Sequence, residues 1–186
     1  MGGTILRVWS AGCSTGQEAY SIAMMLENEL EKGRKAFRYR IIATDISESA
    51  LELANKGVYR EEAIQNIRAR DINRFFERDI ENYTVCERLK RNVSFSRYDL
   101  LDPFSANPQE SIFGNFDLVI CSNVLFYFEK EHQRFILGKL VNALVGNGYL
   151  ITGEAERQNV LKYCALRSVV PPSPIFQKNA EALNEI

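Results

Sequence analysis

Residues 5–16 read Ile5-Leu6-Arg7-Val8-Trp9-Ser10-Ala11-Gly12-Cys13-Ser14-Thr15-Gly16. The apolar run from Ile5 to Trp9 predicts a buried strand, and the small residues from Ser10 onward end it. Glu18 to Lys32 then shows apolar residues at helical spacing. A glycine turn between a strand and a helix lets the backbone approach a ligand and leaves free N–H groups for an anion. A tight turn that simply needs glycine is the alternative.

The same alternation of strand and helix patterns continues along the chain. We expect further strands at 39–44, 93–98, 116–121 and 149–152, and helices at 49–55 and 131–144. Ser49 and Glu52 have capping-box spacing, and Gly57 stops that helix. Residues 58–82 look irregularly helical, 146–148 form a turn, and 166–170 with 175–177 are expected to pair as a hairpin. The alternation predicts an α/β fold with a mainly parallel sheet, which binds ligands beyond the carboxyl ends of its strands.

Composition fits one domain over residues 1–186, with 46% hydrophobic residues and a net charge of −1. No basic surplus predicts a nucleic-acid or membrane-surface partner. Four cysteines without C-x-x-C spacing and a single histidine argue against a metal site, and we expect none. The cysteines read as reduced thiols, and the longest apolar stretch, 116–128, is too short to cross a bilayer. A cytoplasmic protein without membrane insertion is therefore expected.

Two acidic residues, Asp45 and Asp99, stand at the ends of predicted strands. Asp45 could accept hydrogen bonds from both ribose hydroxyls of a nucleotide cofactor, or it could cap the next helix, with Ser47 or Ser49 as competitors. Asp99 could accept an adenine amino group while Leu100 packs on the base, although an exposed turn residue is the alternative. No G-x-G-x-x-G or G-K-[ST] motif is present, so neither a dinucleotide fingerprint nor a P-loop is satisfied.

The fourth strand is followed by Ser122, Asn123 and, four residues later, Tyr127. This spacing can place Asn123 and Tyr127 over a ligand, whereas ordinary core packing is the alternative for 124–128. His132 lies among charged residues and reads as a solvated helix residue.

Taken together, these segments resemble the CheR-type chemotaxis receptor methyltransferase family. Residues 7–21 look like the family's W-S-A-x-C-S-T-G-E-E-P-Y-S, and 43–59 look like A-T-D-I-[DS]…L…A…G-x-Y. Residues 95–101 resemble F-x-x-x-N-L-L, and 116–128 resemble F-D-…-C-R-N-V-L-I-Y-F. Residues 149–156 loosely resemble the G-H-S-E strand end. The motifs recur in order over nearly the whole chain.

The resemblance implies a class I S-adenosylmethionine-dependent methyltransferase fold, Rossmann-like, with helices on both sheet faces and an antiparallel C-terminal strand. It implies S-adenosylmethionine as methyl donor, S-adenosylhomocysteine as product, and glutamate side chains of a chemoreceptor cytoplasmic domain or another protein as acceptor. Tyr127 matches a tyrosine near the transferable methyl group. The residues expected to contact the donor are Gly12, Ser14, Glu18, Asp45, Ile46, Asp99, Leu100, Ser122 and Asn123.

The sequence departs from the family pattern at several positions. Asp99 stands for Asn and can still accept a hydrogen bond, whereas Ser122 stands for Arg and cannot supply its charge or reach. The remaining departures are Gln17 for Glu, Ala19 for Pro, Phe126 for Ile, and Glu154-Ala155-Glu156 for the His-Ser-Glu portion. Family members carry an N-terminal helical domain, whereas four residues precede the first strand here. We therefore expect the isolated chain to bind the donor product but to be weakly active.

The expected reaction suits a chain without a histidine or cysteine catalytic constellation. A glutamate acceptor is already ionised near pH 7, with a pKa of ~4.3, and needs no general base. Three alternatives remain: a donor-binding module with little catalysis, a methyltransferase for a non-receptor acceptor, and an NAD-dependent oxidoreductase on a similar sheet.

Overall fold

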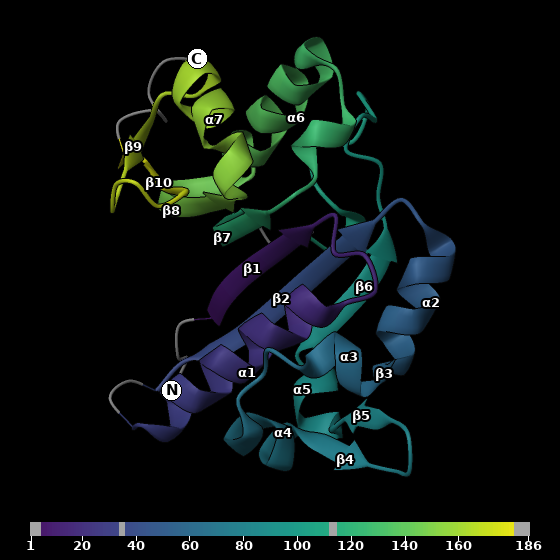
Figure 1. Ribbon diagram of the computed structural model, residues 1–186. Helices are drawn as coiled ribbons and strands as arrows, with labels where there is room; N and C mark the ends of the chain where they lie inside the picture. Colours follow the sequence, from purple (N-terminus) through teal and green to yellow (C-terminus); the bar gives the residue numbers. More distant parts are fainter. Residues whose placement is uncertain (1–4, 34–35, 112–114, 181–186) are drawn as a thin grey trace.

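The central sheet of the described residues has seven strands in the order β6-β2-β1-β7-β8-β10-β9 (Figure 1). This computed structural model describes residues 5–33, 36–111 and 115–180. The strands are β1 (Ile5–Ala11), β2 (Arg38–Asp45), β6 (Val93–Arg97), β7 (Phe116–Cys121), β8 (Leu144–Thr152), β9 (Leu166–Ser168) and β10 (Ile175–Lys178). The first five run parallel, while β10 is antiparallel to both β8 and β9. The mainly parallel sheet and the C-terminal hairpin are confirmed.

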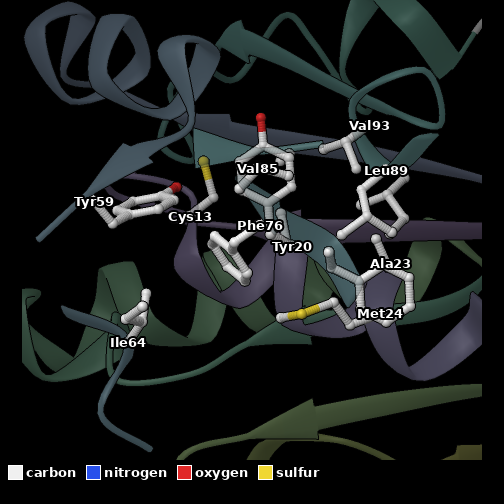
Figure 2. Packing of buried hydrophobic residues seen from close by; sticks show 14 of the residues in the cluster. Cys13, Tyr20, Ala23, Met24, Tyr59, Ile64, Phe76, Val85, Leu89 and Val93 are labelled. Carbon is white, nitrogen blue, oxygen red and sulfur yellow. The ribbon is translucent and has the colours of Figure 1, made fainter. Parts of the chain in front are cut away.

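Helices cover both faces of this sheet (Figure 1). Val8 and Trp9 are adjacent in β1 and belong to two different cores, because successive strand residues point to opposite faces. The Val8 side is covered by α1 (Gln17–Glu31), α2 (Glu48–Lys56) and α5 (Glu87–Lys90), and the Trp9 side by α6 (Lys130–Asn142) and α7 (Arg157–Tyr163). Figure 2 shows side chains of α1 and α5 packed in the first core. In the described ranges, no helix is long and apolar enough to span a membrane.

Residues 58–85 form a small second sheet, which corrects the expectation of irregular helix across 58–82. Its strands are β3 (Val58–Tyr59), β5 (Tyr83–Val85) and β4 (Phe76–Arg78), all antiparallel. The helical portion is limited to α3 (Glu61–Ile64) and α4 (Ala69–Phe75). Phe76 and Val85 are buried against α1 in the first core, so the sheet gains its stability from burial rather than from strand length (Figure 2).

The structure corrects two local predictions, one about the N-cap of α2 and one about a turn before β8. Ser47, rather than Ser49, caps α2: its Oγ accepts from the backbone N of Ala50 at 3.3 Å, because Ser47 is extended and Ser49 already lies in the helix. Gly57 ends α2 as expected, in a left-handed conformation. The predicted turn at 146–148 lies inside β8, where the pairing steps from Phe116–Leu144 to Leu118–Tyr149. The extra β8 residues form a bulge, so the strand begins at Leu144 rather than Tyr149.

Candidate functional site

A cavity of about 530 Å³ lies at the carboxyl edge of the sheet. This volume is within the usual range for small-molecule sites, and the edge is where parallel sheets bind ligands. A larger cavity, about 880 Å³, is lined by the amino halves of β1 and β2 and lies at the opposite edge. The smaller cavity is lined by Gly12, Ser14, Asp45, Ile46, Tyr98, Asp99, Leu100, Ser122, Asn123, Val124, Tyr127 and Phe128.

Every residue that the sequence placed at the site, except Glu18, lines this cavity. The Glu18 carboxylate instead accepts a hydrogen bond from Ser10 Oγ at 2.6 Å, in the contact between α1 and β1. Burial raises the pKa of the Glu18 carboxyl group. Tyr98, Val124 and Phe128 line the cavity but were not predicted, because an apolar residue next to a strand end reads equally well as core.

The Asp45 carboxylate joins the two loops that form one wall of the cavity. Its Oδ2 accepts from the backbone N of Ser14 at 2.8 Å, and its Oδ1 accepts from the backbone N of Ser47 at 2.9 Å. The alternative reading of Asp45 as the cap of α2 is therefore wrong, since Ser47 fills that role. Each carboxylate oxygen can accept a further bond, so Asp45 can hold a ligand hydroxyl while fixing both loops.

Gly12 brings the loop after β1 against the loop after β7. Its φ is +77°, and a Cβ built on it would lie 2.5 Å from Val124 Cγ2. The backbone N atoms of Gly12 and Cys13 both donate to the Thr44 carbonyl oxygen, at 2.8 and 2.9 Å. A side chain at position 12 would therefore fill the space between these loops, which explains the glycine on physical grounds.

Apolar and polar groups share the remaining walls. Leu100 is buried and Ile46 is half exposed, and both present aliphatic surface to the cavity. Asp99 Oδ1 accepts from the backbone N of Leu101 at 2.8 Å, which orients this exposed carboxylate at the end of β6. The combination can hold a flat apolar ring with polar substituents at its edge.

The loop after β7 forms the opposite wall of the cavity. It is held in place by Glu156, a residue that the sequence analysis did not assign to the site. Asn123 has a φ of 60°, and η2, a 3-10 turn over Leu125–Tyr127, follows. Tyr127 is 78% exposed, and its ring stacks at 4.3 Å between centroids on Phe126. The buried Glu156 carboxylate accepts backbone hydrogen bonds from this loop. Only the loose G-H-S-E similarity pointed toward Glu156.

The cavity lining contains carboxylates and hydroxyls but no histidine, cysteine or lysine. Among its lining residues the charged ones are Asp45 and Asp99. Cys13 and Cys121 are free, buried and outside the lining, and burial raises the pKa of the Cys13 thiol to about 12. His132 is exposed on α6. Within the described ranges, no group of three His, Cys, Asp or Glu side chains could hold a metal ion. The arrangement can bind and orient a polar ligand.

Comparison with known proteins matches this fold and sequence to methyltransferases. Residues 1–166 match the family model described as CheR methyltransferase, SAM binding domain. The chain is 37% identical over 155 residues to the chemotaxis protein methyltransferase of Borreliella burgdorferi, covering 81% of this chain and 52% of that protein. It is 36% identical over 154 residues to the Escherichia coli K12 protein of the same description, covering 81% and 51%. The chain thus spans about half the length of the curated relatives it matches.

A solved structure gives the fold independently. The N-methyltransferase NodS of Bradyrhizobium japonicum, in complex with S-adenosyl-L-homocysteine, aligns with a TM-score of 0.55 over 95% of this chain and 79% of that one. The sequences are 17% identical. This likeness confirms the class I methyltransferase fold expected from the sequence.

Proposed function

This chain belongs to the CheR methyltransferase family, and on that premise we propose that it binds S-adenosylmethionine in the cavity at the carboxyl edge of its sheet. The acceptor is a glutamate carboxylate of a bacterial chemoreceptor, which becomes a methyl ester. The main support for the proposal is that one cavity is lined by predicted donor-contact residues from the ends of four strands. The descriptions of the relatives as chemotaxis protein methyltransferases support the acceptor class.

The cavity fits the donor in shape and chemistry. Because Gly12 has no side chain, the loop after β1 packs directly against Val124 at the cavity wall. Asp45 supplies carboxylate oxygens suited to ribose hydroxyls, and Asp99 supplies one suited to an amino group. Ile46 and Leu100 present aliphatic surface suited to the faces of a purine. Ser122 adds a hydroxyl at the end of β7, where the family resemblance implies an arginine.

The proposed methyl transfer requires orientation of the donor and acceptor more than it requires proton transfer. S-adenosylmethionine supplies an electrophilic methyl group on a sulfonium. A glutamate acceptor is ionised near neutral pH, so a cavity lined by carboxylates, hydroxyls and aromatic rings is sufficient. Tyr127 and Phe128 stand at the end of the β7 loop, where they orient the acceptor and exclude water from it. Correct positioning alone can contribute several orders of magnitude in rate.

A methyl-transfer assay tests the proposal. The chain is incubated with tritiated S-adenosylmethionine and a chemoreceptor cytoplasmic fragment, and the label is then treated with mild base. Methyl esters release volatile methanol, whereas methylated amines keep their label. A fragment whose acceptor glutamates are all replaced by glutamine is the matched control, and the E. coli relative is the positive control.

The expected result is base-labile label on the glutamate fragment and none on the glutamine fragment. Base-stable label would show a different acceptor and contradict the proposal. If the chain binds S-adenosylhomocysteine but transfers no methyl group while the relative does, the chain is a binding module and the proposed activity is wrong.

A further inference from the structure

Glu156 is a buried carboxylate surrounded by backbone donors from two segments of the chain. It lies in η3, the 3-10 turn Glu154–Glu156, and is 2% exposed. Its Oε1 accepts from the backbone N of Val124 at 2.8 Å and of Leu125 at 2.6 Å. Its Oε2 accepts from the backbone N of Asn123 at 3.1 Å and of Gly153 at 2.8 Å. Four N–H groups thus converge on one side chain.

These N–H groups need an acceptor because of the way the chain leaves β7. Asn123 is left-handed, and η2 begins two residues later, so the first amides of this turn have no earlier carbonyl within the turn to bond. An anion near the amino end of a helical turn also stabilises its aligned dipoles. Glu156 therefore acts as a cap for η2, supplied from about thirty residues away in the sequence.

The loop after β7 and the segment 153–156 pack closely against each other. A Cβ built on Gly153 would lie 2.7 Å from Asn123 Oδ1 and 3.0 Å from Glu156 Oε2. A side chain at position 153 would therefore push the η3 segment away from the β7 loop. The backbone itself closes this side of the loop, and the carboxylate lies between the two segments.

The loop held by Glu156 is a wall of the proposed donor cavity. Asn123 and Val124 line the cavity directly, and Tyr127 follows in the same turn, with its N donating to the Val124 carbonyl at 3.2 Å. The position of Tyr127 thus depends on the amides that Glu156 binds. The Glu156 carboxylate does not line the cavity.

We propose that Glu156 is a positioning residue of the methyltransferase site, acting through the 123–127 loop on donor affinity and on the placement of Tyr127. The part that concerns the donor rests on the proposed function, whereas the anchoring of the loop does not. Glutamine at position 156 keeps the size of the side chain but replaces one acceptor oxygen by an NH2 group. That group would face two backbone donors, whichever way the amide is turned.

The test compares Glu156→Gln with Glu156→Asp and the wild-type chain. Binding of S-adenosylhomocysteine is measured by calorimetry, and hydrogen exchange is followed for the amides of 123–125. We expect Glu156→Gln to weaken binding at least about tenfold, because buried donors lose their acceptor. Exchange at 123–125 should accelerate at the same time. Glu156→Asp keeps the charge with a shorter reach, so its affinity should lie between those of the other two proteins.

Two control variants separate positioning from general stability. Glu154→Gln makes the same chemical change on an exposed residue of the same turn and should leave affinity and exchange unchanged. Val85→Ala removes buried volume from the small sheet, so it should lower the free energy of unfolding without changing affinity. Equal loss of affinity in Val85→Ala and Glu156→Gln would overturn the inference, as would wild-type affinity and exchange in Glu156→Gln.

The experiment still tests the role of Glu156 if the variant does not fold or if the wild-type chain does not bind. If Glu156→Gln does not fold, the comparison of Glu156→Asp with Glu154→Gln decides between a graded local effect and none. If the wild-type chain binds no S-adenosylhomocysteine, the proposed function fails, and exchange alone decides whether Glu156 anchors the loop. Faster exchange confined to 123–125 supports the anchoring, and unchanged exchange overturns it.

Discussion

Asp45 ends β2, and Asp99 lies two residues beyond the end of the neighbouring strand β6. Their carboxylates make different hydrogen bonds with the backbone. Asp45 accepts from two separate loops through its two oxygens, at Ser14 and at Ser47. Asp99 Oδ1 accepts from Leu101, two residues along the chain, in a local turn. Asp45 is therefore both a proposed ligand contact and a structural link between the β1 and β2 loops, whereas Asp99 is oriented by its own turn.

We predict that Asp45→Ala weakens S-adenosylhomocysteine binding at least about tenfold, since hydrogen bonds to a charged group contribute about 1.5–3 kcal/mol each. Titration calorimetry measures the change. Asp79→Ala is the matched control, because Asp79 also accepts a backbone bond in a turn, from Ile80, but lies beside the small sheet. Undiminished affinity in Asp45→Ala would remove Asp45 from the site.

At the scale of helices and strands, the sequence predicted the long elements and the C-terminal hairpin but missed the small second sheet. The strands β1, β2, β6 and β7 contain apolar or alternating runs, and the helices α1 and α6 have apolar residues at helical spacing. The strands β3, β4 and β5 have two or three residues each, too few for a period to appear. The bulge in β8 read as a turn because Gly146-Asn147-Gly148 suits both structures.

The candidate site was predictable for a related reason. Its residues lie at strand ends, which the apolar periods locate and the family resemblance marks. Glu156 was not identified as a positioning residue because its partners at 123–125 are distant in sequence and are backbone amides. A backbone amide donates a hydrogen bond whatever its side chain is, so such contacts leave no pattern in the sequence. Glu18 illustrates the converse: the family resemblance implies a donor contact, yet its side chain bonds to Ser10 and does not line the cavity.

The close contact between the β1 and β7 loops leads to a prediction at Gly12. Gly12→Ala should lower the free energy of unfolding and weaken S-adenosylhomocysteine binding, because the added Cβ would overlap Val124. Gly33→Ala is the matched control: Gly33 also has a positive φ, of +65°, but nothing lies within 4 Å of its Cβ position. Both variants carry the backbone cost of about 1–2 kcal/mol. If Gly33→Ala loses as much stability and affinity as Gly12→Ala, the steric explanation is wrong.

For the molecule as a whole, burial on the α1 side of the sheet affects the titration of several core side chains. The core on the α1 side contains Tyr20, Tyr39, Tyr59 and Cys13. Burial raises the pKa of all three phenols and of the Cys13 thiol, the last to about 12. The folded chain thus keeps protons that the unfolded chain releases near pH 9 to 10.

This difference predicts a loss of stability in alkali. Groups with a raised pKa in the folded state stabilise it fully below their unfolded pKa, and that contribution falls as the pH rises through the folded value. The free energy of unfolding in urea should therefore decrease from about pH 9 toward pH 12, and less steeply in Tyr59→Phe. Phenolate absorbance should rise together with unfolding. Constant stability over this range, or phenols that all titrate near 10 in the folded protein, would contradict the burial argument.

The central claim is that the carboxyl-edge cavity binds the methyl donor and its product. The most direct measurement is a calorimetric titration of the 186-residue chain with S-adenosylhomocysteine, followed by competition with S-adenosylmethionine, with NADH titrated in parallel. We predict one S-adenosylhomocysteine per chain, displacement by S-adenosylmethionine, and no comparable binding of NADH. A folded chain that binds neither S-adenosyl compound, or that prefers NADH, would contradict the claim.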